Sequence, residues 1–334
     1  MTNHPIDVII PWVDGSDQRL TEKRNLYLEK ERRSDKDSGA LATRFASNNE
    51  IKYCVLSILK FAPFVRNIFI VTDEQDPKVH DEVRKYFPDR VDTVKLVDHK
   101  EIFKGFEDFL PTFNSSSIST MFWRLDGLAE NFVYINDDFF LIRDINPEEW
   151  FDGNRPVIRG KWLFPPLKKV LANSIKVFMS KHISRRGDYK PKISFYYRQW
   201  HTATSLSARF GHRYFFHCHT PYPMNRTVLA NYFDDNAEVL KETIKPRFRQ
   251  ANQLLITALS NHLEILLGNR RFAKLNLGYF HPIYSRNRIQ SKVKQCQTDS
   301  SIKSICVQSV DMFPADLREF FFEWITSILD LPQK

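Results

Sequence analysis

The sequence predicts an α/β protein with a mainly parallel, Rossmann-like sheet covered by helices on both faces, followed by a basic, mostly helical C-terminal part. Two observations lead to this prediction. Over roughly the first 150 residues, short and almost wholly apolar segments alternate with amphipathic ones, a pattern typical of parallel strands buried on both faces. Beyond that point the alternation fades, and one segment carries most of the excess positive charge.

The first strand is predicted over residues 6–13 (IDVIIPWV), which are almost all apolar. The turn residues of DGSD at 14–17 end this strand. Residues 19–36 are strongly charged and predict an exposed helix. The chain therefore begins with a buried strand, a polar turn and a solvated helix.

A second helix is predicted over residues 50–62 (EIKYCVLSILKFA), whose apolar positions form one stripe at helical spacing. Asn48 or Asn49 is the expected N-cap, and Pro63 marks the end. We expect this helix to pack its apolar stripe against the sheet.

Strand and helix alternate through the rest of the N-terminal half. Apolar, β-branched residues predict strands at 67–73, 91–98 and 131–136. Helices are predicted between these strands at 78–87 and 117–129. Neither a dinucleotide-binding glycine pattern nor a phosphate-binding P-loop occurs in this half, so those two classes of nucleotide site are not expected.

The C-terminal half is predicted to be mostly helical. Helices are expected near residues 223–233, 236–244, 249–267 and 314–329. The last of these is strongly apolar, and we expect it to dock on the rest of the protein rather than to anchor in a membrane.

Composition narrows the class of protein further. Hydrophobic residues make up 42% of the 334 residues and aromatic residues 14%, which excludes a disordered or fibrous chain. No apolar run is long enough to predict a membrane span, and the first residues lack a basic leader segment. These features predict a cytoplasmic protein.

A basic segment covers residues 155–198, where twelve lysines and arginines face one acid, Asp188. Such a segment favours phosphate-bearing partners, such as a lipid surface or a diphosphate-linked acceptor, although a solvated helical face would look the same. No nucleic-acid-binding motif accompanies it, so nucleic acid is not an expected partner. The expected division is a core at 1–151, a basic insertion at 152–205 and a C-terminal part at 206–334.

Acidic residues interrupt an apolar run at residues 131–142 (NFVYINDDFFLI). Asn136, Asp137 and Asp138 directly follow a predicted buried strand, and Phe139 resumes the apolar run. Two adjacent buried carboxylates repel each other and are costly without a cation. The carboxyl end of a strand in an open α/β sheet is also where ligands bind. We therefore predict a Mg²⁺ or Mn²⁺ site here, with a solvated turn as the alternative.

A second acidic turn follows the first strand. Asp14 and Asp17 lie directly after it. Because the carboxyl ends of parallel strands meet at one edge of a sheet, both acidic turns are expected to face the same crevice.

Several blocks of this sequence resemble successive motifs of the Stealth family, which includes bacterial capsule and cell-wall polysaccharide phosphotransferases and the animal lysosomal-enzyme GlcNAc-1-phosphotransferase. The blocks are DVIIPWVDGSD (7–17), RFASNNEIKYCVLSILKFAPFVRNIFIVTDEQ (44–75), LPTFNSSSI (110–118) and FWRLDGLAENFVYINDDFFL (122–141). Farther on, HTPYPMNR (219–226) and RFR (247–249) resemble later motifs. Similarity in the C-terminal half is patchier.

The resemblance implies a glycosyltransferase-A-like, Rossmann-like fold and a hexose-1-phosphate transferase. Such an enzyme joins hexose-1-phosphate from a UDP-sugar to a hydroxyl of a growing polysaccharide and releases UMP. The expected partners are the UDP-sugar donor and a lipid-linked oligosaccharide acceptor, with a peripheral contact of the basic segment on the inner face of the bacterial membrane. The alternatives are a metal-dependent glycosyltransferase that releases UDP and a non-catalytic scaffold of polysaccharide assembly.

Roles follow from the resemblance position by position. Asp137 and Asp138 match the acidic pair and are the expected metal ligands, and His219 is the expected general base. The remaining residues expected to act in catalysis are Asp14, Arg226 and Arg249. Contacts with the substrates are expected from Asp17, Arg44, Asn49, Glu50, Asn114, Ser115, Arg124 and Asn136.

Some of these residues also have ordinary structural interpretations. Glu50 can act as a first-turn acid that stabilises the helix dipole, and Asn114 with Ser115 can cap a helix. Arg124 can pair with Asp126.

The sequence departs from the family pattern in the block before the acidic strand. Met121 and Trp123 stand where family members often have histidine. If one of those histidines is catalytic elsewhere in the family, this chain must use another base. The alternative is a different acceptor geometry. His219 is the expected base because of its position in the block HTPYPMNR.

Overall fold

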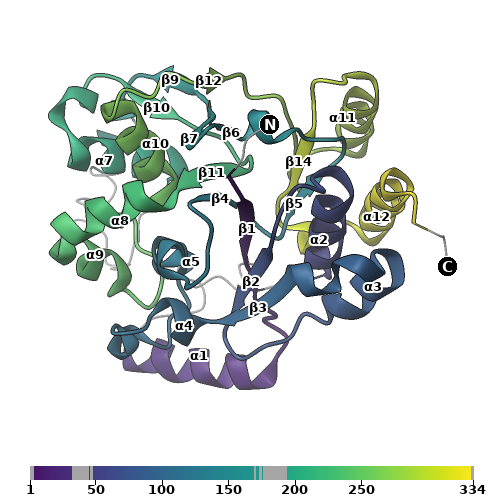
Figure 1. The fold of residues 1–334 in the computed structure, drawn as a ribbon, viewed down its shortest axis with the longest axis horizontal. Coiled ribbons are helices and arrows are strands. Elements are labelled where there is room, and N and C mark those ends of the chain that lie inside the picture. The colour runs from purple at the N-terminus through teal and green to yellow at the C-terminus, as the bar shows by residue number, and fades with distance from the viewer. Residues whose placement is uncertain are drawn as a thin grey trace.

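Figure 1 shows a central sheet flanked by helices in the computed structural model of the chain. The structure describes residues 4–31, 45, 48–168, 171, 172, 175 and 194–331. The central sheet has the strand order β11-β4-β1-β2-β3. Its strands are β1 (Ile6–Pro11), β2 (Ile68–Thr72), β3 (Val94–Asp98), β4 (Asn131–Tyr134) and β11 (Tyr222–Asn225).

Four of these strands run parallel, and only the edge strand β11 runs antiparallel. β1 pairs in parallel with β2 and β4, and β2 pairs in parallel with β3. β2 and β4 are buried along their whole length because helices cover both faces. The predicted mainly parallel sheet is confirmed, and the carboxyl ends of its four parallel strands share one edge.

The helices of the N-terminal half follow the predicted order. They are α1 (Gln18–Lys30), α2 (Glu50–Phe61), α3 (Val79–Tyr86), the short α4 (His99–Ile102) and α5 (Ser115–Thr120). Asn49 stands at the N-cap position of α2, but its backbone is left-handed with φ of 62° and its side chain makes no capping hydrogen bond. The start of α2 is therefore set by backbone geometry rather than by the predicted side-chain cap.

The C-terminal half is helical, as predicted, with additional short strands. Its helices are α7 (Phe195–Leu206), α8 (Arg226–Asp235), α9 (Ala237–Ile244), α10 (Ile256–Leu266), α11 (Arg286–Thr298) and α12 (Ala315–Leu329). In Figure 1, α2, α3 and α12 lie to one side of the central strands, and α5, α8 and α9 lie to the other.

The terminal helix α12 docks on the protein, as expected. Its buried residues include Phe321 and Trp324, and Phe322 stacks on Tyr53 of α2 with ring centroids 4.9 Å apart. Within the described part of the chain, no helix combines the length and the apolar character that crossing a membrane requires.

The helix predicted over residues 117–129 is much shorter. α5 ends at Thr120, a 3₁₀ turn covers Phe122–Arg124, and Gly127 has φ of 77°. The backbone N–H of Ala129 donates to the carboxylate of Asp7 (2.7 Å). A tertiary hydrogen bond and a left-handed glycine thus replace the last two turns of the expected helix.

Two further helix boundaries differ from prediction. Residues 222–225 form β11 because they pair with the open edge of β4, and α8 begins only at Arg226. Residues 249–255 precede α10 instead of belonging to it. Gln253 in this stretch is buried, and its side chain donates to the carbonyl of Thr243 (2.9 Å). Gln253 also accepts from the side-chain amide of Asn114 (2.9 Å), so in both cases a partner distant in sequence takes part.

A second sheet, not predicted, extends from the acidic turn. It has the order β13-β14-β5, formed by β5 (Phe139–Leu141), β13 (Leu277–Phe280) and β14 (Ser304–Val307). Three two-stranded ladders complete the fold: β6 (Phe151–Asp152) with β7 (Arg155–Pro156), β8 (Ile158–Arg159) with β12 (Phe272–Ala273), and β9 (Lys161–Leu163) with β10 (Tyr214–Phe216). Most of the basic segment lies outside the described residues.

Candidate active site

A cleft of about 400 Å³ opens at the carboxyl ends of β1, β2 and β4. This is the edge of an open parallel sheet at which ligands bind. Residues far apart in the sequence meet here, from Trp12 after β1 to Asp311 after β14. Six of the residues that the sequence singles out line it: Glu50, Ser115, Asn136, Asp137, Asp138 and Arg249.

The acidic turn after β4 forms part of the cleft wall. The N–H of Phe139 donates to the carbonyl of Asn136 (3.1 Å), which closes a turn between β4 and β5. Tyr134 donates from its hydroxyl to the Asn136 side-chain oxygen (2.6 Å) and so fixes that amide. The turn thereby points Asp137 and Asp138 toward the cleft that both residues line.

Four carboxylates share this part of the cleft. Burial, with the neighbouring Asp138 and Glu50, holds the pKa of Asp137 well above its ordinary value. Burial raises the pKa of Asp138 to about 7, and the charge of Glu50 adds to the effect. Burial also raises the pKa values of Glu50 and Asp311. The cluster is therefore electrostatically costly when ionised, and a bound cation would relieve that cost.

Asp7 shows how this protein satisfies a buried carboxylate when the role is structural. Asp7 accepts two hydrogen bonds from the guanidinium of Arg66 (2.9 and 2.5 Å) and others from the N–H groups of Asn67 and Ala129. At Asp138, by contrast, Cys306 donates its thiol to Oδ2 (3.8 Å), and the buried Oδ1 has no hydrogen-bond partner among the described residues. A buried carboxylate left in this state indicates a ligand.

The donor set fits a magnesium-like ion that shares its coordination with substrate. Mg²⁺ typically takes one or two carboxylates and completes its shell with water and phosphate oxygens. Asp137 and Asp138 supply two carboxylates, and Asp138 Oδ1 is available. No three histidine, cysteine, aspartate or glutamate side chains in the described part of the chain are arranged to hold a metal. Two carboxylates with one open oxygen fit an ion that takes its other ligands from water and phosphate oxygens.

Arg249 brings positive charge to the same cleft. Its guanidinium donates to the hydroxyl of Ser115, at the start of α5. An arginine and a helix-start hydroxyl beside an acidic cluster can bind phosphate oxygens while a cation occupies the carboxylates. Arg249 and Ser115 are therefore the phosphate-binding candidates of the site.

His219 lies beside the cleft rather than among its lining residues. Its ring stacks between Phe195 and Tyr279, with centroids 4.8 and 5.6 Å apart. Burial, with the charges of Arg249 and His281, lowers the pKa of His219 to about 4. The imidazole is therefore neutral near pH 7, the form that accepts a proton.

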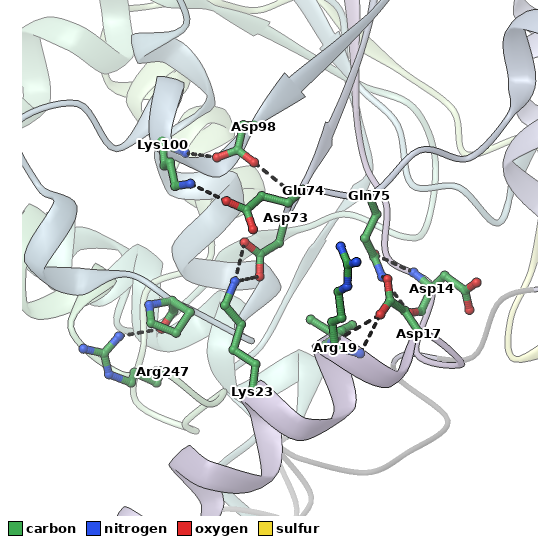
Figure 2. A network of polar contacts seen from close by, with 12 residues as sticks. Asp14, Asp17, Arg19, Lys23, Asp73, Glu74, Gln75, Asp98, Lys100 and Arg247 are labelled. Atoms are coloured by element: carbon green, nitrogen blue, oxygen red, sulfur yellow. Dashed lines mark hydrogen bonds and ion pairs between the residues drawn. The ribbon is translucent and has the colours of Figure 1, made fainter.

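Asp14 and Asp17 occupy the turn between β1 and α1 (Figure 2). Asp17 caps α1 by accepting from the N–H groups of Arg19 and Leu20 (2.8 and 3.3 Å). Asp14 accepts from the N–H and the hydroxyl of Ser16 (2.9 and 2.7 Å). Neither residue is among those that line the cleft, although Trp12 and Val13, directly before Asp14, are.

Two of the predicted arginines make structural contacts outside the cleft. Arg226 donates to the carbonyls of Trp123 (2.8 Å) and Leu128 (3.2 Å). Arg124 donates to the carbonyl of Ile102 (3.2 Å) rather than pairing with Asp126. These contacts tie the chain before β4 to its neighbours. Arg44 lies outside the described residues.

Asn114 and Asn49 also lie outside the cleft lining. Asn114 is fully buried, caps α5 by accepting from Ser116 (3.1 Å), and donates to the carbonyl of Pro246 (2.8 Å). It therefore joins the start of α5 to the loop that carries Arg249 and positions both. Asn49 is exposed at the start of α2.

Sequence reasoning missed three titratable residues that line the cleft: Asp73, His99 and Asp311. Asp73 directly follows β2 and pairs with Lys23 of α1 (2.8 Å), as Figure 2 shows. His99 directly follows β3, and burial lowers its pKa. Position at a strand end would have identified both of these. Asp311 arrives from the C-terminal region, and no local signal predicts it.

The fold and the cleft define an α/β protein with an acidic cleft at the carboxyl edge of a mainly parallel sheet. Conserved region 1 of the Stealth proteins matches residues 4–32, and conserved region 2 matches residues 44–157. Residues 4–32 and 44–157 are therefore similar to the two conserved regions of the Stealth proteins.

Named relatives agree with this similarity. The capsular polysaccharide phosphotransferase cps1A of Actinobacillus pleuropneumoniae is 38% identical over 45% of this chain and 39% of its own length. An exopolysaccharide phosphotransferase of Streptomyces coelicolor is 31% identical over 82% of this chain and 41% of its own length. The chain thus spans about two fifths of the length of these relatives. Among solved structures, the bifunctional glycosyltransferase WbbM aligns with 98% of this chain and 50% of its own at 12% identity, with a TM-score of 0.47.

Proposed function

We propose that this protein is a sugar-phosphate transferase that moves hexose-1-phosphate from a UDP-sugar to a hydroxyl of a growing polysaccharide in capsule or cell-wall biosynthesis. The acceptor hydroxyl oxygen bonds to the β-phosphorus, the bond from that phosphorus to the bridging oxygen breaks, and UMP leaves. The proposal is supported by the relatives described above, which are named capsular and exopolysaccharide phosphotransferases.

The observation that carries the proposal is the pairing of an acidic cluster with Arg249 in one cleft. Asp137 and Asp138 would hold Mg²⁺ or Mn²⁺, which when bound would neutralise charge on the diphosphate. Arg249 and Ser115 would bind the oxygens of the transferred phosphoryl group, where catalysis is mostly positioning and electrostatics. His219, neutral near pH 7, would take the proton of the attacking hydroxyl.

A lipid-linked oligosaccharide at the inner face of the bacterial membrane is the acceptor that we propose. The basic segment at 155–198 would hold its diphosphate or the anionic lipid around it. Most of that segment lies outside the described residues, so this part rests on charge alone.

The released nucleotide tests the reaction directly. Purified protein would be incubated with UDP-GlcNAc or another UDP-hexose, Mg²⁺ or Mn²⁺, and a lipid-linked or synthetic oligosaccharide. We expect acceptor-dependent UMP together with a product that carries a phosphodiester. Release of UDP with a glycosidic product would instead show a metal-dependent glycosyltransferase, and the absence of any metal-dependent nucleotide binding would favour a scaffold.

The raised pKa of Asp138 predicts how stability and metal binding depend on pH. The folded carboxyl titrates near pH 7, well above its unfolded value of 3.8. Its protonation therefore stabilises the metal-free fold fully below about pH 4, and this contribution is lost as the pH rises through about 7. Metal binding requires the ionised carboxylate, so stabilisation by Mg²⁺ with UDP should grow between about pH 6 and pH 8.

Thermal unfolding at several pH values, with and without Mg²⁺ and UDP, measures both trends. In Asp138→Asn, the stability of the metal-free protein and the stabilisation by Mg²⁺ with UDP should both depend less on pH. Asp144→Asn, a change at an exposed aspartate outside the cleft, should keep both pH dependences of the unaltered protein. A metal-induced stabilisation that stays constant across this pH range would contradict the assignment of Asp138 as a ligand.

A further inference from the structure

A second pocket, of about 170 Å³, lies apart from the acidic cleft. It is formed where the end of β5 and the start of β14 meet the ladder of β8 and β12. Three basic side chains line it, Arg159, Lys274 and Lys303, and among its described lining residues Glu149 is the only acid. The charge of this pocket is therefore opposite to that of the acidic cleft.

The internal contacts leave a surplus of positive charge. Lys303 pairs with the carboxylate of Glu149 (2.6 Å), which accounts for the single acid. Arg159 donates to the backbone carbonyl of Glu149 (2.5 Å), and burial lowers the pKa of its guanidinium. Within the described part of the chain, the carbonyl of Glu149 is the hydrogen-bond partner of this half-buried guanidinium, and such a cation favours an incoming anion.

The remaining lining residues suit an oxyanion. Thr220 and Ser304, whose side chains carry hydroxyl groups, line the pocket alongside the three cations. Lys274 is exposed at the pocket mouth, directly after β12, so an anion on a flexible chain can reach it from solvent. A planar guanidinium, two ammonium groups and hydroxyls together match the several acceptor oxygens of a phosphate group.

The pocket is joined to the acidic cleft by a rigid pair of strands. Leu141 of β5 lies opposite Ser304 of β14, and both line the basic pocket. At the other ends of these strands, Asp138 and Gln308 line the acidic cleft. Three to four strand residues therefore separate the two sites, a span of about 10–13 Å.

His219 connects the two sites from a third segment. Thr220 and Pro221, which line the basic pocket, directly follow His219 in the chain. The ring of His219 also lies edge-on to Phe139, the residue after Asp138 (6.4 Å between ring centroids). An oligosaccharide bound in the basic pocket can thus reach toward the proposed base, His219, over a length of a few sugars.

We propose that the basic pocket binds a phosphodiester of the acceptor chain. This inference rests on the proposed function, because each round of hexose-1-phosphate transfer leaves a phosphodiester in the product. A growing acceptor then carries a phosphodiester a short distance behind its reactive hydroxyl. Binding that group would align the next hydroxyl with the cleft and favour elongation over initiation.

Two synthetic acceptors that differ in one linkage test the proposal. One ends in the reactive sugar joined through a phosphodiester to the preceding sugar, and the other has a neutral glycosidic link there. We expect the unaltered protein to show about a tenfold lower KM for the phosphodiester acceptor, with similar kcat. Lys274→Glu should abolish this preference by raising KM for the phosphodiester acceptor alone.

Matched variants separate pocket chemistry from general charge effects. Lys95→Glu makes the same charge change on β3, the far edge strand of the sheet, and should keep the preference. Arg159→Lys retains the charge without the planar fork and should weaken the preference several-fold. Equal KM values for the two acceptors in the unaltered protein, or an equal effect of Lys274→Glu on both acceptors, would overturn the proposal.

Direct binding keeps this test independent of the reaction. Calorimetric titration with the phosphodiester oligosaccharide should show weaker binding to Lys274→Glu than to Lys95→Glu, whether or not UMP is released. Inorganic phosphate should compete only weakly, because it lacks the sugars on either side. Equal binding to both variants overturns the pocket assignment, and phosphate binding as tight as the oligosaccharide overturns the claim for a phosphodiester. Failure to release UMP would bear on the proposed reaction alone.

Discussion

Replacement of Asp138 by asparagine is expected to reduce turnover on the order of a thousandfold while leaving the protein folded. The ion that Asp137 and Asp138 would hold supplies several kcal/mol of charge stabilisation, and each 1.36 kcal/mol corresponds to about tenfold in rate. Asparagine keeps the shape of the side chain but removes its charge. Turnover with saturating UDP-sugar and metal, together with Mn²⁺ binding, measures the effect.

Stability should change in the opposite direction. The carboxyl group of Asp138 is mostly ionised at about pH 8, and it is buried close to Asp137 and Glu50. Its Oδ1 lacks a hydrogen-bond partner among the described residues. Removal of this charge should raise the free energy of unfolding of the metal-free protein by roughly 1 kcal/mol. Asp144→Asn, at an exposed aspartate, serves as the control. A folded Asp138→Asn variant with normal metal-dependent turnover would remove Asp138 from the site.

Replacement of His219 by phenylalanine is expected to lower turnover at least about a hundredfold, as general-base catalysis contributes roughly 10²–10⁴-fold. Phenylalanine is chosen because the ring of His219 stacks between Phe195 and Tyr279. An aromatic replacement preserves that packing but cannot accept a proton. Single-turnover rates with saturating acceptor isolate the chemical step from binding.

The comparison with His219→Ala distinguishes chemistry from packing. If the ring acts only by stacking, phenylalanine should retain activity and alanine should lose both activity and stability. If His219 is the base, both variants should lose turnover, and only alanine should also lower the unfolding temperature. Retained turnover in His219→Phe would contradict the assignment and turn attention to His99, which lines the cleft.

Local sequence patterns predicted the central sheet well. β1, β2 and β4 fall within predicted segments because an apolar run bounded by polar turns is sufficient evidence for a buried parallel strand. The same patterns gave a wrong end for the helix expected over residues 117–129. There the carboxylate of Asp7 accepts a hydrogen bond from the N–H of Ala129. That hydrogen bond joins positions 122 residues apart, so no window of the sequence contains it.

The candidate site was predicted in part, for a related reason. Asp137, Asp138 and Glu50 line the cleft, whereas Asp14 and Asp17, which also belong to a family block, are used in a turn and a helix cap. Motif position identifies a residue type and an approximate place at a strand end. Whether the side chain turns toward the cleft or toward its own backbone depends on neighbours such as Gln75, which holds the Asp14 turn.

By itself, the sequence determined the parallel sheet, the acidic turn after β4 and, through its blocks, the similarity to the Stealth family. Apolar runs, helical patterns, turn residues and motifs are local properties that can be read directly from the sequence. Only the tertiary structure decided that Asp311 and Arg249 meet Asp138 in one cleft. It also placed Arg159, Lys274 and Lys303 in a basic pocket at the opposite end of β5 and β14. The residues of the cleft and of the basic pocket meet because strands from distant segments of the chain pair with each other. A local sequence pattern does not show which distant segments pair.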